Sequence, residues 1–185
     1  RVIYKKKMLS AQQDYENTKD KKYLKLISRY NNIQMARKIS LNSAYGAIGN
    51  QWFRYYDKAI AEGITKSGQL SIRWIENKLN KYLNNILKTN DDYVIASDTD
   101  SVYLTMDKLV TETIKSDNVL SKTINFLDKV ASESIEPYIT KSYDELKQYT
   151  NAFANKMFMK REVIADKGIW VAKKRYILNV WNSEG

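Results

Sequence analysis

The strongest indication of the fold class comes from residues 93–106, which read YVIASDTDSVYLTM. Residues 93–97 and 101–106 are rich in β-branched and aromatic side chains, and the three residues between them are Asp98, Thr99 and Asp100. Two such runs separated by a short polar stretch predict a strand, a tight turn and a second strand. The segment is therefore expected to form a β-hairpin with two carboxylates at its tip.

Helical periodicity precedes and follows this hairpin. Residues 1–17 contain no helix breaker, and apolar residues recur at three- and four-residue steps over residues 21–47 and 58–87. A turn at residues 17–20 would join the first two segments into an antiparallel helical hairpin. Residues 119–149 also have a helical pattern, with Pro137 opening a second helical stretch.

The last part of the chain returns to a strand pattern. Residues 157–159 lead into a strand at 163–165, Asp166-Lys167-Gly168 is expected to form a hairpin turn, and residues 169–181 would be the return strand. The predicted fold class is α+β, with an antiparallel helical hairpin followed by antiparallel β-hairpins packed on helices.

Missing residue types restrict the chemistry. The 185 residues include no cysteine and no histidine, which excludes disulfides, thiolate or histidine metal sites, and imidazole-based catalysis. Any bound metal must use oxygen ligands, which favours ions like Mg²⁺. The sequence contains no apolar run of about 18 residues and no signal peptide, so the chain is predicted to be soluble and intracellular, without a membrane partner.

Positive charge is concentrated at the start of the chain. The formal net charge is +10, and residues 1–38 hold 11 basic and 3 acidic residues. Such a field indicates a polyanionic partner, a nucleoside triphosphate or a nucleic acid. A solvated helix face that aids solubility explains the charge equally well.

Asp98 and Asp100 are the first candidate site. Two carboxylates this close repel each other unless a cation lies between them. Mg²⁺ binds a few carboxylates and completes its shell with water and substrate phosphate, and two such ions can promote phosphoryl transfer. The alternative is structural, because aspartate is common in turns for local backbone reasons.

Lys38, Asn42 and Tyr45 form a second candidate site. Their i, i+4 and i+7 spacing places them on one face of a helix. The lysine can hold a triphosphate, the amide can bond a phosphate or sugar, and the phenol ring can lie against a base. Gly46 leaves room for close backbone approach. A solvated polar face is the alternative.

Arg1 and Lys5 extend this positive surface. They are four residues apart on the first predicted helix, and antiparallel pairing of the two helices would bring them to face Lys38. Three converging cations are costly unless an anion lies among them. The arrangement predicts a triphosphate pocket that depends on this pairing.

Three motifs resemble those of family B DNA polymerases. Residues 38–50, KISLNSAYGAIGN, resemble the fingers-helix motif, and residues 97–101, SDTDS, resemble the palm motif. Lys174-Arg175-Tyr176 resembles the K-x-Y motif that contacts the primer end. The motifs occur in the family's order, and the segments around them are similar to polymerases of T-even-type tailed bacteriophages.

The resemblance implies roles for individual residues. Asp100 matches an aspartate that ligates two catalytic Mg²⁺ ions, Asp98 matches its partner, and Glu162 matches an acidic residue near the metals. Incoming-nucleotide binding is implied for Arg1, Lys5, Lys38, Asn42 and Tyr45. DNA contacts are implied for Gly46, Lys174 and Tyr176.

The resemblance also implies an organisation, with fingers at residues 1–50 and a partial palm at 51–185. The expected partners are primer–template DNA, deoxynucleoside triphosphates and a sliding clamp bound through other regions, in the cytoplasm of a bacterial host. A second metal aspartate is expected upstream of Arg1, so the chain is interpreted as an inactive fragment or a split-gene piece. Two departures from the family pattern are Ser97 in place of glycine and Lys160 in place of aspartate.

Other functions fit parts of the sequence. A basic chain with 14 tyrosines could bind nucleic acid without catalysis. A different Mg²⁺ enzyme with a D-x-D motif, such as a nuclease or glycosyltransferase, would not need the Lys38 face. A purely structural interpretation leaves the cationic residues unexplained.

Overall fold

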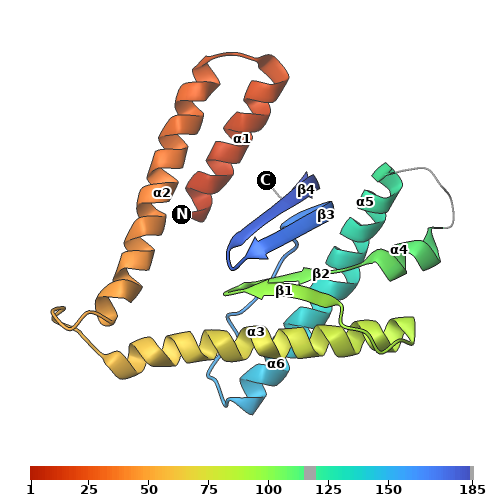
Figure 1. The fold of residues 1–185 in the computed structure, drawn as a ribbon. Coiled ribbons are helices and arrows are strands. Elements are labelled where there is room, and N and C mark those ends of the chain that lie inside the picture. Colours follow the sequence, from red (N-terminus) through yellow and green to blue (C-terminus); the bar gives the residue numbers. More distant parts are fainter. Residues whose placement is uncertain (115–119, 184–185) are drawn as a thin grey trace. The chain divides into compact units, whose positions relative to one another are not determined.

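The computed structural model describes residues 1–114 and 120–183 and confirms the predicted α+β class (Figure 1). The chain divides into two compact units, the N-terminal unit, Arg1–Thr65, and the C-terminal unit, which begins at Lys66. The predicted division into fingers and palm at residue 50 stays a prediction. Among the described residues, no helix is long and apolar enough to cross a membrane.

The N-terminal unit contains an antiparallel helical hairpin, as predicted (Figure 1). Helix α1 (Val2–Thr18) and helix α2 (Lys22–Ile48) are joined by a turn in which Lys19 has a φ of 54°. The ring of Tyr4 lies 6.3 Å from that of Tyr30, and the guanidinium of Arg37 lies 5.7 Å from the Tyr4 ring centroid. The start of α1 is therefore level with the middle of α2.

Helix α3 (Lys58–Leu87) has the bounds predicted from its periodicity. Asp57 caps its start, because the carboxylate Oδ1 accepts a hydrogen bond from the Ile60 amide at 3.0 Å. Its buried residues lie on one stripe: Ser71, Ile75, Leu79 and Leu83.

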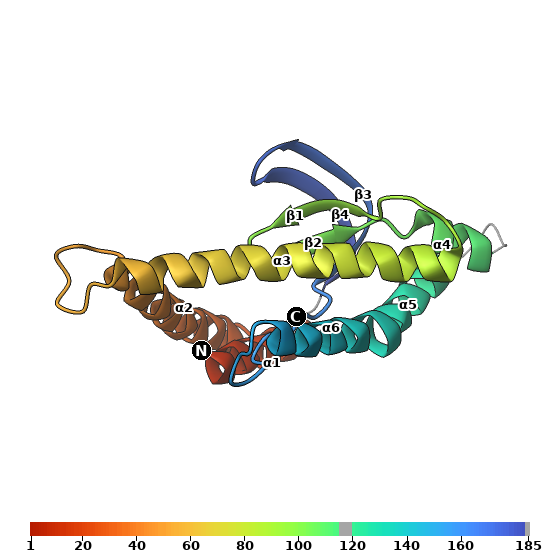
Figure 2. The same ribbon diagram turned by 90° about the horizontal axis from the view of Figure 1, so that it is seen from below.

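The core of the C-terminal unit forms where α3 meets helix α6 (Glu136–Tyr149). The buried apolar cluster consists of Ile75, Leu79, Ile139, Tyr143 and Leu146. The Trp74 indole donates a hydrogen bond to the Ser142 carbonyl at 2.9 Å, and Tyr82 and Tyr138 stack with centroids 4.1 Å apart. Figure 2 shows the first β-hairpin on one side of α3 and α6 on the other.

The predicted helical stretch before α6 contains a change of helix type. Helix α4 (Asp107–Thr113) precedes it, and helix α5 (Leu120–Val130) continues through a π-helical turn, Ala131–Ile135, into α6. Pro137 lies in the first turn of α6, as predicted. A proline has no N–H and its ring crowds the preceding turn, which is compatible with a wider turn just before it. Residue 119, the predicted start, lies outside the described residues.

The first β-hairpin matches the prediction from residues 93–106. Strand β1 (Val94–Asp98) pairs antiparallel with strand β2 (Ser101–Leu104), and Asp98 opposes Ser101. The loop therefore consists of Thr99, with a φ of 44°, and Asp100. Side chains of β2 pack against the helical core and fix the hairpin on it.

The second β-hairpin corrects one prediction. Strand β3 (Val163–Ala172) pairs antiparallel with strand β4 (Arg175–Ser183), and the chain reverses at Lys173-Lys174, where Lys174 has a φ of 62°. The predicted turn at Asp166-Lys167-Gly168 is wrong, because Lys167 and Gly168 lie within the ladder opposite Asn179 and Leu178. The return strand accordingly does not begin at Ile169. Residues 157–159 lie outside any strand.

Side-chain contacts explain why the turn lies elsewhere. Asp166 accepts a cross-strand hydrogen bond from Asn179 at 2.8 Å. Desolvation raises the pKa of Asp166, but hydrogen bonds from Asn179 and Trp181 outweigh it and hold the pKa below its ordinary value. Gly168 lies beneath the ring of Trp170, where a Cβ would approach ring atoms to 2.7 Å. Asp166 and Gly168 therefore both make contacts within the β3–β4 ladder, which explains why the chain does not turn there.

Arg161 joins the base of this hairpin to the helices. Its guanidinium lies 2.7 Å from Asp128 Oδ1 on α5 and donates to Asn182 Oδ1 at 3.0 Å. The Arg161 amide also donates to Glu136 Oε1 at 3.0 Å. The Arg161 side chain is only 18 % exposed, so these contacts satisfy a largely buried charge.

Candidate functional site

The acidic turn, Asp98–Asp100, is held by hydrogen bonds to Asp98. The Ser101 hydroxyl donates to the Asp98 carbonyl at 3.1 Å, and the Thr99 hydroxyl donates to Asp98 Oδ1 at 3.0 Å. Asp100 is exposed, and its carboxylate accepts no hydrogen bond from residues 1–114 or 120–183. The turn therefore presents one free carboxylate beside a second, partly bonded one.

The acidic turn supplies too few ligands to complete a metal site. No group of three or more acidic side chains in the described part of the chain is arranged to hold a metal ion. Glu162, just before β3, does not complete such a group, and its role stays a prediction. The donor set nevertheless suits Mg²⁺, which takes one or two carboxylates and completes its shell with water and phosphate oxygens.

Asn80 fixes the strand that leads to the acidic turn. Its Oδ1 on α3 accepts hydrogen bonds from the amides of Tyr93 at 2.9 Å and Val94 at 3.2 Å. One turn later, Asn84 Oδ1 accepts from the Asp91 amide at 2.8 Å. The start of β1 is thus attached to the helix. Neither asparagine was predicted, although their i, i+4 spacing beside an apolar stripe was a usable signal.

Tyr45 is held by a residue that was not predicted. Its hydroxyl lies 2.7 Å from Oγ1 of Thr65 on α3. Because the Thr65 hydroxyl donates to the Ala61 carbonyl at 3.0 Å, Tyr45 is the donor in the shared bond. The ring keeps a defined position while remaining partly exposed.

The positive residues of the N-terminal unit lie on its surface. Arg1, Lys5 and Lys38 are all exposed, and none of them forms an ion pair with the residues that the structure describes. The antiparallel pairing on which their juxtaposition depended is present, with Arg37 beside Tyr4. Their convergence on one anion stays a prediction.

Asn42, Tyr45 and Gly46 are all exposed and lie near the C-terminal end of α2. A Cβ built on Gly46 would meet no atom within 4 Å among the described residues. Internal packing therefore gives no reason for glycine at this position, and the open space is available to a bound molecule.

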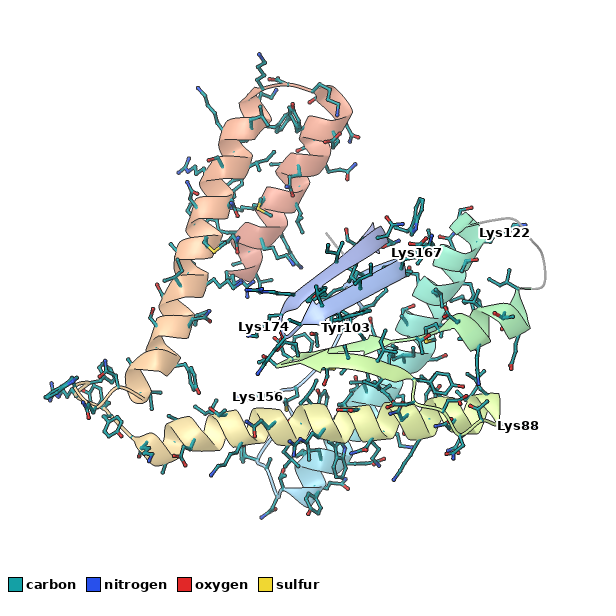
Figure 3. All side chains as sticks on the ribbon, in the orientation of Figure 1. Lys88, Tyr103, Lys122, Lys156, Lys167 and Lys174 are labelled. Carbon is teal, nitrogen blue, oxygen red and sulfur yellow. The ribbon has the colours of Figure 1, made fainter. Side chains whose placement is uncertain are left out.

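Lys174 and Tyr176 lie at the turn end of the β3–β4 hairpin, and Figure 3 labels Lys174 there. Tyr176 is 42 % exposed, and its ring lies 5.4 Å from Tyr103 of β2 and 6.2 Å from Trp170 of β3. Burial, together with a hydrogen bond to Tyr176, raises the pKa of the Tyr103 hydroxyl to about 12. Neither Tyr103 nor Trp170 was predicted as part of a site.

The helical hairpin, the acidic turn and the Lys-x-Tyr hairpin carry the three motifs that resemble those of DNA polymerases, and these motifs indicate the class of protein. The family model of DNA polymerase family B matches residues 3–185. The chain belongs to this family, and the resemblance predicted from its three motifs is confirmed.

Individual relatives give the same result. The chain is 44 % identical over 162 residues to the DNA-directed DNA polymerase of Escherichia phage RB69, which covers 82 % of the chain and 18 % of the relative. The chain is 43 % identical over 167 residues to the DNA-directed DNA polymerase of Enterobacteria phage T4, and the match covers 83 % of the chain and 18 % of the relative. A DNA polymerase of Choristoneura biennis entomopoxvirus is 24 % identical to the chain over 210 residues, and the match covers 96 % of the chain and 20 % of the relative. The chain thus spans about a fifth of the length of these relatives.

Proposed function

We propose that the chain is the fingers and part of the palm of a DNA-directed DNA polymerase that replicates phage DNA in the cytoplasm of a bacterial host. The reaction joins a deoxynucleotide to a primer 3′-hydroxyl under the direction of a template and releases pyrophosphate. The observation that carries the proposal is the free carboxylate of Asp100, presented by a two-residue turn in a family B chain.

Asp98 and Asp100 would hold divalent metal, with Mg²⁺ the best match to an all-oxygen donor set. Water, substrate phosphate and the aspartate expected upstream of Arg1 would supply the other ligands. When bound, the metal would stabilise the charge that develops during phosphoryl transfer. A sliding clamp would bind through other regions of the polymerase.

The other residues would bind and orient the substrates. Lys38, with Arg1 and Lys5, would neutralise the triphosphate, and Asn42 would bond a phosphate or sugar oxygen. The ring of Tyr45 would lie beside the new base pair. Positioning and fixed charge account for most catalysis of phosphoryl transfer, so a chain without histidine is adequate.

The primer end would be held by the β3–β4 hairpin. Lys174, at the turn, would contact the primer backbone, and Tyr176 would contact the primer–template minor groove. Gly46 would admit the DNA close to the α2 backbone, because its missing side chain leaves open space.

Replacement of Asp100 tests the proposal in the full-length polymerase. Asp100→Ala should lower single-turnover incorporation by at least about 10³-fold and leave the primer–template Kd within about threefold. Asp107→Ala, on the exposed start of α4, is the matched control and should incorporate normally. Normal incorporation by Asp100→Ala would refute the proposed metal role.

The chain by itself is a candidate for DNA binding without catalysis. The favouring observation is that no group of three or more acidic ligands is present in the described residues. The isolated chain is expected to bind primer–template DNA in low salt and to extend no primer. Extension by the chain alone would show that its own residues complete the site.

A further inference from the structure

Three aromatic residues from three strands pack against one another in the C-terminal unit. Tyr103 of β2 contacts Trp170 of β3 edge to face, with centroids 5.4 Å apart and planes at 74°. It contacts Tyr176 of β4 at 5.4 Å and 64°, while Trp170 and Tyr176 stack at 6.2 Å and 28°. We name Tyr103, Trp170 and Tyr176 the aromatic cluster; Figure 3 labels Tyr103 beside the hairpin.

The position of Trp170 is fixed by the strand beneath it. Its six-membered ring occupies the space where a side chain at residue 168 would begin, and only a glycine leaves that space free. Leu178, opposite Gly168 in the ladder, approaches the same space. The indole therefore lies against the backbone of its own hairpin, and edge-to-face and stacked partners restrict its remaining motion.

Strand β2 connects the cluster to the acidic turn. Tyr103 lies on this strand two residues after Ser101, and its ring contacts that of Tyr176. Ser101, the first residue of β2, in turn donates from its hydroxyl to the Asp98 carbonyl. Strand β2 thus joins the acidic turn, through Ser101, to the ring of Tyr176, through Tyr103.

Two sets of contacts hold the β3–β4 hairpin in its orientation. Its base is attached to α5 through Arg161 and Asp128. The face opposite the cluster is exposed, with Ile177 74 % and Ile169 66 % exposed. Toward the turn that carries Lys174, the aromatic cluster joins the hairpin to β2.

We propose that Tyr103 and Trp170 are positioning residues, which set the orientation of Tyr176 relative to Asp100 and so hold the primer end at the metal-binding turn. The inference rests on the proposed polymerase function. Tyr103 and Trp170 would affect DNA binding only through Tyr176. They would not contact the reacting atoms themselves.

The first test uses Trp170 variants of the full-length polymerase. Trp170→Ala should weaken primer–template binding about tenfold and slow incorporation at saturating nucleotide by a similar factor, because Tyr176 loses its stacked partner. The apparent nucleotide affinity should stay within about twofold. Trp170→Phe, which keeps a ring, should return both quantities to within about threefold of the parent.

A double-mutant cycle separates positioning from general destabilisation. In a Tyr176→Ala background, Trp170→Ala should change primer–template affinity by less than about twofold, because the residue through which it acts is gone. Ile177→Ala, next to Tyr176 but on the opposite face, should bind DNA like the parent. Tyr103→Ala, which removes the edge-to-face ring, should weaken DNA binding about five- to tenfold, whereas Tyr103→Phe, which keeps the ring, should stay within about twofold of the parent.

Several outcomes would overturn the inference. If the losses from Trp170→Ala and Tyr176→Ala multiply in full, Trp170 acts independently of Tyr176. Unchanged DNA binding by Tyr103→Ala would remove Tyr103 from the mechanism. Normal DNA binding by Tyr176→Ala would also overturn it, yet would leave the polymerase function standing if Asp100→Ala abolishes incorporation. Normal incorporation by Asp100→Ala would instead refute the function on which the inference rests.

Discussion

The Tyr45 hydroxyl donates to Oγ1 of Thr65 over 2.7 Å, so a residue of α3 holds a ring that we assign to the nucleotide site. Thr65→Val removes the acceptor with little change of shape. We expect an approximately fivefold loss of apparent nucleotide affinity in single-turnover kinetics, since one hydrogen bond contributes about 1 kcal/mol. Thr140→Val, which loses only an exposed bond to its own helix, is the control. Equal nucleotide affinity in both variants would exclude a role for Thr65.

Lys38→Ala tests the positive face of α2. Lys38 is exposed and forms no ion pair within residues 1–114 and 120–183. Its loss should weaken nucleotide binding about tenfold or more, while primer–template affinity changes less than about threefold. Single-turnover incorporation at varied nucleotide concentration measures the first quantity, and fluorescence anisotropy of labelled DNA measures the second. Lys66 lies on another helix, α3, and Lys66→Ala serves as a charge-matched control. An unchanged nucleotide affinity for Lys38→Ala would contradict the assignment.

Two glycine substitutions should have opposite effects on stability. Gly168→Ala places a Cβ 2.7 Å from Trp170 and Leu178 atoms, so the indole and the leucine methyl group must shift, and the free energy of unfolding should fall by about 1–3 kcal/mol. Gly68→Ala, within α3 and with no atom within 4 Å of the added group, should stabilise by about 0.5–1 kcal/mol. Urea unfolding followed by circular dichroism measures both changes. A stabilising Gly168→Ala would show that the Trp170 ring moves freely.

Alkaline pH should weaken the contribution of Tyr103. Its pKa is raised from 10.0 to about 12, so the fold favours the neutral phenol. The neutral Tyr103 phenol therefore stabilises the folded state fully below about pH 10, and this contribution is lost as the pH rises toward about 12. The difference in Tm between the parent and Tyr103→Phe should therefore shrink from about pH 8 to about pH 11.5. Parallel pH profiles for Tyr103→Phe would contradict this expectation.

The two ion pairs of α5 should differ in strength. Asp128→Ala removes the partner of Arg161, whose side chain is 18 % exposed, and should cost about 1–3 kcal/mol because that charge loses its carboxylate. Glu133→Ala breaks an exposed pair with Lys129 at 3.9 Å and should cost less than about 0.5 kcal/mol. Denaturant unfolding of both variants provides the comparison. Equal losses would show that burial of Arg161 has little energetic effect.

Local sequence patterns predicted the helical hairpin, α3 and the first β-hairpin. The three- and four-residue recurrence of apolar residues located α2 and α3 within one residue, and the DTD turn between apolar runs located β1 and β2. These signals depend on residues near in sequence, where periodicity and turn chemistry are informative.

The wrong turn in the second hairpin has a tertiary cause. Asp166-Lys167-Gly168 has strong turn chemistry, but Gly168 is needed beneath Trp170 and Asp166 bonds Asn179 across the ladder. The actual turn uses Lys174 at a positive φ, a conformation that lysine seldom adopts. A local pattern could not distinguish the two positions.

The supporting residues of the candidate site were missed for a related reason. Asn80, Thr65 and Trp170 act on residues outside their own helix or strand through a few hydrogen bonds or ring contacts. The i, i+4 spacing of Asn80 and Asn84 was a usable signal of a polar site on α3, but it does not identify the amides that they bind. Thr65 and Trp170 belong to residue types common in helices and strands, and the sequence does not identify their partners. Asp100 became a candidate through its motif position, and its role stays a prediction. The contacts made by Asn80, Thr65 and Trp170 are visible only in the fold.

Helix α3 combines two levels of stability in one element. It is about 45 Å long, yet its four buried residues all lie beyond residue 70, and Ile60 and Ile64 near its start are exposed. Backbone amides of the first turns should therefore exchange hydrogen early, while those around Leu79 stay protected until the core opens. Bending or partial unwinding of the first turns would disturb little of the core, whereas unwinding around Leu79 would expose its buried side chains.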